Sequence, residues 1–293
     1  MLRPPLRISA RVLTSSAWHF RSTPVSYTLY SVFTFERADA LQISGCPEAF
    51  QNEDNLVLQG FREVFREAGQ TPFPVKLHID AEVPVARGLG SSSTCIAAGA
   101  AAANAFLGSP FAKDELFQIC ARFEGHPDNA APVTFGGFTA SFAADERFHA
   151  LRMPLDQNWK FAVIIPDYEV RTADARRAMP KEIAVKDSVF TTSHAIAMIE
   201  ALRSGSEELL AEACQDVLHE PCRRKLIKDY DSVRASAKAA GAPAFFISGS
   251  GSTMIALTKS ETVAERFIEL VRARHPNFAG HVLHAAADGV RVE

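Results

Sequence analysis

The chain lacks long apolar runs, paired cysteine motifs and an excess of positive charge. No stretch approaches the roughly eighteen apolar residues of a membrane helix, so we expect a soluble protein without a membrane partner. The five cysteines are odd in number and never spaced Cys-x-x-Cys, which favours buried reduced thiols and a cytoplasmic location over disulfides or a metal site. A formal net charge of −3 indicates no nucleic-acid partner.

Helical and strand patterns are mixed without a regular βαβ repeat. Strand patterns fall at 30–45, 75–79, 160–170, 242–257 and 280–293, and a loop from 124 leads into a further strand that ends near 142. Helical patterns fall at 54–69, 95–107, 113–123, 172–239 and 261–274. The helix from 54 is expected to bury Leu58, Phe61, Val64 and Phe65. With 293 residues, the chain is long enough for two cores. We therefore predict an α+β fold in two domains, 1–155 and 156–293.

A loop almost bare of large side chains stands before the alanine-rich helix, in EVPVARGLGSSSTCIAAG from Glu82 to Gly99. Gly88 and Gly90 let backbone N–H groups approach an anion, and the helix places the positive end of its dipole there. The loop has neither the Walker lysine nor a Gly-x-Gly-x-x-Gly spacing. It predicts another type of polyphosphate site, in which Ser91 or Ser92 contacts phosphate or Mg²⁺. A plain serine helix cap is the alternative.

Three segments resemble, in order, motifs of the GHMP small-molecule kinases: PVARGLGSSST (84–94), EGHPDNAAPVTFGGF (124–138) and FFISGSGSTMIAL (245–257). The second resembles the homoserine kinase branch in particular. The resemblance implies an N-terminal domain with a left-handed βαβ unit, a ferredoxin-like C-terminal domain, and ATP and substrate between them. It implies ATP-dependent phosphorylation of L-homoserine in threonine biosynthesis, with Mg²⁺ as cofactor and a homodimer as one possible assembly. Another GHMP kinase is the nearest alternative.

The resemblance also implies which residues bind the nucleotide. Asn55 is expected near the adenine, and Ser92 and Glu124 are expected to hold Mg²⁺. The phosphates are expected to contact two glycine turns, formed by Arg87, Gly88, Leu89, Gly90, Ser91, Ser92 and Ser93 and by Gly249, Ser250 and Gly251. For Glu124, a solvated charge at a helix end is the alternative.

By the same resemblance, catalysis falls to Ser92, Glu124, Asn129 and Arg176, and substrate binding to Asn129, Arg176 and Arg223. The arginines would bind the homoserine carboxylate, because a guanidinium pairs with a carboxylate through two parallel hydrogen bonds. Solvated helix arginines are the alternative. Asp128 is expected to be structural and His126 a scaffold residue. No dedicated protein base is expected, since charge stabilisation dominates phosphoryl transfer.

The N-terminal segment departs from the family pattern. The family opens with a motif of the type Pro-Ala-Thr-Ser-Ala-Asn-Leu-Gly-Pro-Gly-Phe-Asp, whose Asn and Asp bind homoserine, but this chain has LRPPLRISARVLTSSAWHFR at 2–21. Codons chosen for Ile8 to His19 and read one base earlier spell Asn-Leu-Gly-Pro-Gly-Phe-Asp-Ile-Leu-Gly-Met-Ala. We therefore hypothesise that residues 1–21 are a frameshifted reading of the first family motif. The alternative is a transit peptide, which the segment resembles because it has arginines and no acidic residue before Glu36. It predicts irregular structure over 1–22 and weak homoserine binding, which would leave an inactive nucleotide-binding relative as a further alternative.

Overall fold

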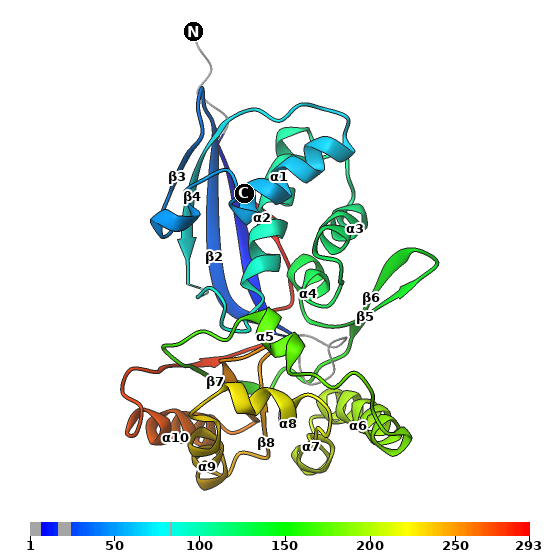
Figure 1. The fold of residues 1–293 in the computed structure, drawn as a ribbon, viewed down its shortest axis with the longest axis vertical. Coiled ribbons are helices and arrows are strands. Elements are labelled where there is room, and N and C mark those ends of the chain that lie inside the picture. Colours follow the sequence, from blue (N-terminus) through cyan, green and yellow to red (C-terminus); the bar gives the residue numbers. More distant parts are fainter. Residues whose placement is uncertain (1–6, 17–24, 83) are drawn as a thin grey trace.

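Two β-sheets organise the chain in a computed structural model that describes residues 7–16, 25–82 and 84–293 (Figure 1). In the described residues the first sheet has seven strands. Its main path runs β11-β1-β2-β4-β3, with β5 joined to β2 and β6 joined to β5. The bounds are β1 Arg7–Ser16, β2 Val25–Arg37, β3 Gln42–Ser44, β4 Val75–Ala81, β5 Phe138–Ala144, β6 Arg147–Met153 and β11 Arg291–Val292.

The first strand corrects an expectation. β1 is antiparallel to β2 from Arg7 to Ser16 with one register shift, and it pairs with β11 on its other edge. Ile8, Ala10 and Val12 alternate into the core at 5%, 0% and 0% exposure, so this sequence has the period of a half-buried strand. The prediction of irregular structure is therefore wrong for Arg7–Ser16, and the pairing counts against the frameshift interpretation. The rest of 1–22 lies outside the described residues.

Four helices cover one face of this sheet: α1 Leu56–Glu67, α2 Ser91–Phe106, α3 Lys113–Glu124 and α4 Ala130–Phe135 (Figure 1). The α1 side chains Leu58, Phe61, Val64 and Phe65 are buried, as predicted. Small residues let α1 and α2 approach closely, since a Cβ on Gly99 would lie 1.9 Å from the Val57 carbonyl oxygen. The parallel β3 and β4 are joined through α1 as a βαβ unit. Its left-handedness stays a prediction.

The second sheet has the strand order of a ferredoxin-like domain. In the described residues its four strands run β10-β7-β9-β8, with α10 joining β9 to β10. The bounds are β7 Lys160–Ile165, β8 Ala244–Ile247, β9 Met254–Thr258 and β10 Ala279–Leu283. On one face Ala162 and Ile164 pack with α9 Tyr230–Ala240 and α10 Glu261–Arg272. On the other face Phe161 and Val163 belong to a hydrophobic cluster that also contains residues of β2 from the first sheet.

A shared core joins the two halves. The first part of β2 contributes Val25, Tyr27 and Leu29 to the cluster of Phe161 and Val163, and Tyr27 lies 4.8 Å from Phe161 between ring centroids. The connecting elements are α5 Thr172–Arg177, α6 Val185–Ser204, α7 Glu207–Ala213, α8 Glu220–Arg223 and the 3₁₀ turns η1 Glu48–Phe50 and η2 Arg224–Leu226. The C-terminal β11 returns to the first sheet. The boundary near residue 155 stays a prediction.

All five cysteines, Cys46, Cys95, Cys120, Cys214 and Cys222, are free thiols. Among the described residues, the helices are all too short or too polar to cross a bilayer.

Candidate active site

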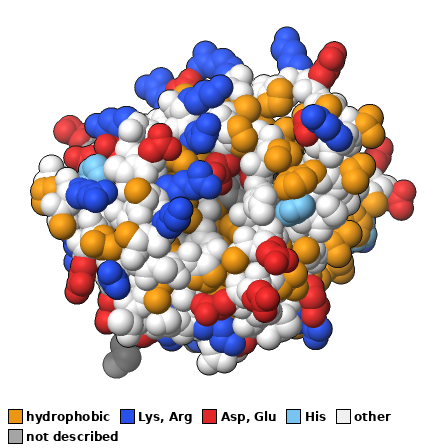
Figure 2. Space-filling model, turned by 90° about the horizontal axis from the view of Figure 1, so that it is seen from below, with side chains coloured by type: hydrophobic (Ala, Val, Ile, Leu, Met, Phe, Trp, Pro, Cys, Tyr) orange, Lys and Arg blue, Asp and Glu red, His pale blue; other side chains and the backbone are white. Residues whose placement is uncertain are grey.

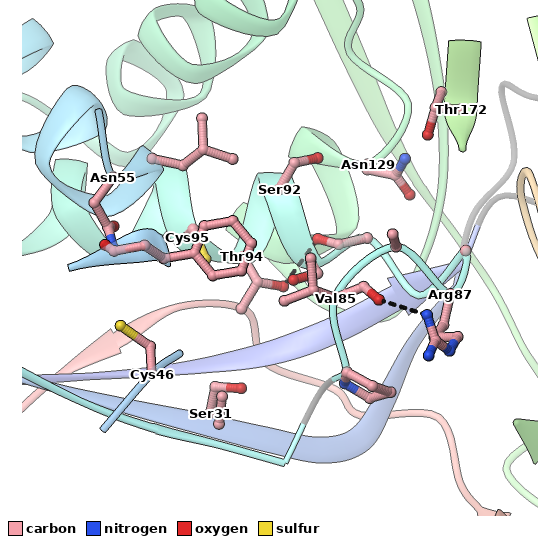
Figure 3. A pocket seen from close by; sticks show the side chains of 18 of the residues that line it. Ser31, Cys46, Asn55, Val85, Arg87, Ser92, Thr94, Cys95, Asn129 and Thr172 are labelled. Carbon is pink, nitrogen blue, oxygen red and sulfur yellow. Dashed lines mark hydrogen bonds between the residues drawn. The ribbon is translucent and has the colours of Figure 1, made fainter. Parts of the chain in front are cut away.

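A cavity of ≈ 850 Å³ lies where the glycine loop and the first turn of α2 meet the loops of the second sheet. Figure 3 shows its labelled side chains, with Cys46, Asn55 and Cys95 toward one end and Asn129, Thr172 and Arg87 toward the other. The predicted residues that line it are Asn55, Arg87, Gly88, Gly90, Ser91, Ser92, Asn129, Arg176, Arg223, Gly249 and Ser250. The fold therefore brings most of the predicted site together.

The glycine loop requires glycine at two positions. Gly88 and Gly90 have φ of +76° and +69°, a region that L side chains rarely adopt. A Cβ on Gly88 would also lie 2.1 Å from the Ser248 carbonyl oxygen. Gly90 caps α2, and no side chain in the described part of the chain caps this helix end. Its first-turn N–H groups are therefore not capped by a serine side chain, which leaves them able to bind an anion.

Glu124 stands beside the same helix end. Ser92 Oγ donates to Glu124 Oε1 at 3.1 Å, and Ser93 Oγ donates to Glu124 Oε2 at 2.5 Å. Burial raises the pKa of Glu124, and the hydrogen bonds from Ser93 and Ser92 oppose this effect. The carboxyl is thus a half-buried acceptor that two serine hydroxyls hold in place. Ser93 itself is 2% exposed, so its hydroxyl positions Glu124.

A divalent cation fits these residues. The described residues include no group of three or more His, Cys, Asp or Glu side chains that could hold a metal alone. Mg²⁺ commonly takes one or two carboxylates and fills its remaining positions with phosphate and water. Glu124 and Ser92 supply two hard oxygen donors next to the anion site of α2. A cation there would compensate the carboxylate that burial disfavours.

The turn after α3 places three polar residues at the cavity. His126 Nδ1 lies 2.5 Å from Asp128 Oδ1, and the Asn129 N–H donates to the same oxygen at 2.9 Å. The hydrogen bond to Asp128 raises the pKa of His126, whereas burial and the charge of Arg176 lower it. Asp128 therefore shapes the turn that presents Asn129, which agrees with its expected structural role.

Two arginines reach the cavity from the second domain. Arg176 lies in the last turn of α5. Arg223 of α8 is 3% exposed, and its Nη1 donates to the Gly249 carbonyl at 2.5 Å. A guanidinium has five N–H donors, so one bond to a carbonyl does not by itself prevent contact with a ligand. Both side chains line the cavity, but only Arg223 is buried there, so a solvated helix arginine remains the alternative for the exposed Arg176.

Several residues that were predicted to contact the nucleotide also make contacts within the protein. Asn55 caps α1, accepting from Val57 N–H at 2.9 Å and donating to the Phe50 carbonyl at 2.7 Å. Leu89 is 1% exposed in the shared core and can offer a ligand only its backbone. The side chain of Arg87 donates to the carbonyls of Pro166 and Asp167 at 3.1 and 3.4 Å and pairs with Glu169. Four predicted residues are not among the described residues that line the cavity: Leu89, Ser93, Glu124 and Gly251.

The apolar wall of the cavity was not predicted. It includes Cys46, Phe50, Val85 and Cys95, which come from the loop after β3, η1, the glycine loop and α2. Burial raises the pKa of Cys95 to about 12, so this thiol is apolar wall and not a nucleophile. Only the apolar character of these residues was visible in the sequence, and it does not distinguish cavity from core.

Family comparisons match both halves of the chain. Residues 55–137 match the family model described as the GHMP kinases N terminal domain, and residues 198–277 match GHMP kinases C terminal. The first match contains the glycine loop, Glu124 and Asn129. The second contains Arg223 and the turn at Gly249.

Individual relatives are similar over most of their length. A homoserine kinase of Clostridium beijerinckii is 36% identical over 259 residues, which cover 87% of this chain and 87% of that protein. A homoserine kinase of Microchaete diplosiphon is 39% identical and covers 80% and 78%. The crystal structure of homoserine kinase from Cytophaga hutchinsonii has a TM-score of 0.87 at 24% identity, covering 100% of this chain and 98% of that one, and thus shows the same fold. The chain belongs to the homoserine kinase branch of the GHMP kinase family.

Proposed function

We propose that the chain transfers the γ-phosphoryl group of ATP to the side-chain hydroxyl of L-homoserine, producing O-phospho-L-homoserine and ADP. The observation that carries this proposal is the meeting, in one cavity, of the glycine loop and α2 N-terminus with Arg176 and Arg223. These are an anion site for polyphosphate and two guanidinium groups for an amino-acid carboxylate. The homoserine kinase names of the similar curated proteins support the same substrate.

The triphosphate is assigned to the glycine loop. The turn at Gly88 to Gly90 opens onto the first turn of α2, where N–H groups and the helix dipole favour negative charge. The nucleoside is assigned to the apolar wall of Cys46, Phe50 and Cys95. This orientation points the γ-phosphate toward Asn129 and Arg176.

Mg²⁺ is assigned to Glu124 and Ser92. Bound there with the nucleotide, it would neutralise charge that develops on the transferring phosphoryl group. Ser93 fixes the second carboxylate oxygen, so the chain presents Glu124 in one orientation. We propose that Glu124 binds the cation in its ionised form.

The acceptor is assigned to the polar end of the cavity. Arg176 and Arg223 hold the homoserine carboxylate, and the Asn129 side chain holds the hydroxyl near the phosphate. The hydroxyl oxygen bonds to the γ-phosphorus as the bond to the β,γ-bridging oxygen breaks, and ADP leaves with that electron pair. The hydroxyl proton leaves late for solvent and no protein base is assigned, because charge stabilisation dominates phosphoryl transfer.

The test is a coupled ADP-release assay with homoserine, mevalonate and galactose at equal concentration. Turnover with homoserine alone supports the proposal, and preference for another acceptor contradicts it. Arg176→Lys keeps the charge but loses the planar pair of donors, so it should raise KM for homoserine more than KM for ATP. Arg177→Lys is the matched control, because Arg177 is exposed and pairs only with Asp174 among the contacts described for its side chain.

One observation favours a second candidate, a nucleotide-binding relative without kinase activity. The N-terminal segment does not have the Asn and Asp that the family motif uses for homoserine. Nucleotide binding without turnover of any acceptor would establish this candidate. A cytoplasmic location accompanies either proposal, supported by the five free thiols.

A further inference from the structure

Arg87 reaches from the glycine loop into the second domain. Its Nε donates to the Pro166 carbonyl at 3.1 Å, its Nη2 donates to the Asp167 carbonyl at 3.4 Å, and its Nη1 lies 3.3 Å from Glu169 Oε1. The same Nη1 donates to the Val85 carbonyl of its own loop, the dashed line in Figure 3. The side chain is only 14% exposed. All three guanidinium nitrogens are therefore engaged by oxygens of the protein.

The second-domain oxygens that hold Arg87 belong to the segment 166–171, which leads directly into α5. This segment follows β7, and α5 carries Arg176, one of the two guanidinium groups assigned to the acceptor carboxylate. Val170 and Ala175 are buried in one hydrophobic cluster, so the segment and the helix pack as a unit. A change in the position of Arg87 is therefore passed on to the helix that carries Arg176.

The other arginine assigned to the acceptor is also connected to the glycine loop. Arg223 Nη1 donates to the Gly249 carbonyl at 2.5 Å. The turn that contains Gly249 packs on the loop, because Ser248 Oγ donates to the Gly88 carbonyl at 2.7 Å. A Cβ on Gly249 would lie 3.1 Å from the same Gly88 oxygen. Both guanidinium groups are thus connected to neighbouring residues of the loop, Arg87 and Gly88.

Charge alone would make the two ligands oppose each other. The phosphates of the nucleotide and the carboxylate of the acceptor are both negative and would lie in one cavity, so their direct interaction is repulsive. Figure 2, which looks onto the second-domain end of the molecule, shows acidic side chains among the basic ones around a hollow, so the charges of this surface partly compensate each other. Favourable coupling between the ligands therefore has to come from contacts between the loop and the groups that hold the acceptor.

We propose that Arg87 is a positioning residue that makes nucleotide and acceptor strengthen each other's binding, which rests on the proposed function for the assignment of both ligands. Phosphates held by the N–H groups beside Arg87 fix its backbone, and its side chain then holds 166–171 and α5 in place. The acceptor meets an ordered Arg176, so less conformational entropy is lost when it binds. By linkage, the acceptor tightens nucleotide binding by the same factor. Arg87 thus acts through Arg176, and its side chain does not hold the phosphates.

The experiment is calorimetric titration of the full chain with homoserine, in the absence and in the presence of Mg²⁺ and an ATP analogue whose β,γ-bridging oxygen is replaced by NH. The coupling is the ratio of the two dissociation constants. We expect about tenfold in the unmodified chain and less than about twofold in Arg87→Lys, which keeps the charge but loses the planar set of donors. Because the ratio compares a variant with itself, a general loss of nucleotide affinity does not change it.

A second pair of variants tests the ion pair without altering the loop. Glu169 is not among the described residues that line the cavity, so Glu169→Gln weakens only the connection and should give a coupling between the two values above. Glu182→Gln is the matched control, because Glu182 is also exposed and lies six residues after Arg176, whereas Glu169 lies seven before it. The control should keep the full coupling. Melting temperatures check that every variant is folded.

Hydrogen exchange gives a readout that needs no acceptor. Mg²⁺ with the ATP analogue should slow amide exchange over 166–177 at least ~threefold in the unmodified chain and not in Arg87→Lys. A chain that binds no homoserine contradicts the proposed function, and exchange over 166–177 then still decides the role of Arg87. Unchanged exchange there, or a coupling near one in the unmodified chain that binds homoserine, overturns the proposal. Full coupling in Arg87→Lys with weaker nucleotide binding overturns it as well and assigns the side chain to the phosphates.

Discussion

The Ser248 hydroxyl donates a hydrogen bond of 2.7 Å to the Gly88 carbonyl and so joins the two domains at the glycine loop. The Thr253 N–H donates to the neighbouring Arg87 carbonyl at 3.2 Å. Arg87 adds its own bonds to Pro166 and Asp167. The second domain therefore sets the position of the loop that is proposed to hold the phosphates.

Gly88→Ala should loosen this contact. The new Cβ would meet the Ser248 carbonyl at 2.1 Å, and φ of +76° adds strain for alanine. We expect a stability loss above ~1 kcal/mol and an ATP affinity about tenfold weaker, measured by thermal melting and calorimetric titration. Gly69→Ala is the control, because its φ is +65° and nothing lies within 4 Å. Equal effects on ATP binding in the two variants would show that the domain contact is unimportant.

Glu124→Gln should reduce turnover by orders of magnitude and yet stabilise the ligand-free protein near neutral pH. Because folding raises the Glu124 pKa, its protonated form favours the folded state, and this contribution is lost as pH rises through the folded pKa. Glutamine has no charged form, so the variant does not lose this stability as pH rises. In acid, where Glu124 is protonated, the melting temperatures of the variant and the unmodified chain should become equal. Mg²⁺ with ATP should stabilise the unmodified chain more than the variant. An unchanged turnover would refute the metal-binding role.

Asp128→Asn should lower the pKa of His126 toward its ordinary value. The hydrogen bond to Asp128 is the largest cause of the raised pKa, and it stabilises the fold below the ordinary His pKa of ~6.5. This contribution disappears as pH rises through the folded pKa. The melting temperatures of variant and unmodified chain should therefore differ more in mild acid than in mild alkali. NMR titration of the His126 ring measures the shift directly, and an unmoved titration would contradict the assigned bond.

Val12→Asp should show whether β1 supports the fold. Val12 pairs with Ser31 of β2 and its side chain is fully buried in the core of the first domain, so an unpaired carboxylate there should cost about 3–5 kcal/mol of unfolding free energy. Arg11→Asp on the exposed face of the same strand is the control and should cost far less, since its cation–π contact with Tyr30 is worth about 0.5–1 kcal/mol. Urea unfolding measures both. Similar small losses would mean that this segment is dispensable.

The first segment should also affect substrate affinity. A chain given the family's Asn-Leu-Gly-Pro-Gly-Phe-Asp motif should bind homoserine ~30- to 5000-fold more tightly than the present chain, because a charged ligand group without its partner costs roughly 2–5 kcal/mol. ATP affinity should not change, since the glycine loop, Glu124 and Gly249 lie elsewhere. Separate calorimetric titrations with ATP and homoserine make the comparison. Equal homoserine affinities would identify the present segment as a functional variant.

The sequence predicted elements whose periodicity is strong and local. The α1 core face and the glycine turn before α2 could be predicted because both depend on neighbouring residues. β6 and the short α4 were not predicted, since β6 is stabilised by pairing with β5 and α4 by packing within the domain. The structural uses of Asn55 and Arg87 were hidden too, because their partners are backbone carbonyls that a sequence does not locate. The error on β1 came from judging Arg7–Ser16 by family likeness instead of its own alternation.

Strand β2 has a consequence for how the protein moves and melts. Its 13 residues run through both interiors, with Val25, Tyr27 and Leu29 in one and Phe33 and Phe35 in the other. Because this one continuous strand packs in both cores, neither half can unfold without exposing apolar residues of the other half. Unfolding should therefore be a single cooperative step. Any opening of the cavity must come from movement of the loops at its rim, while β2 keeps its position in both cores.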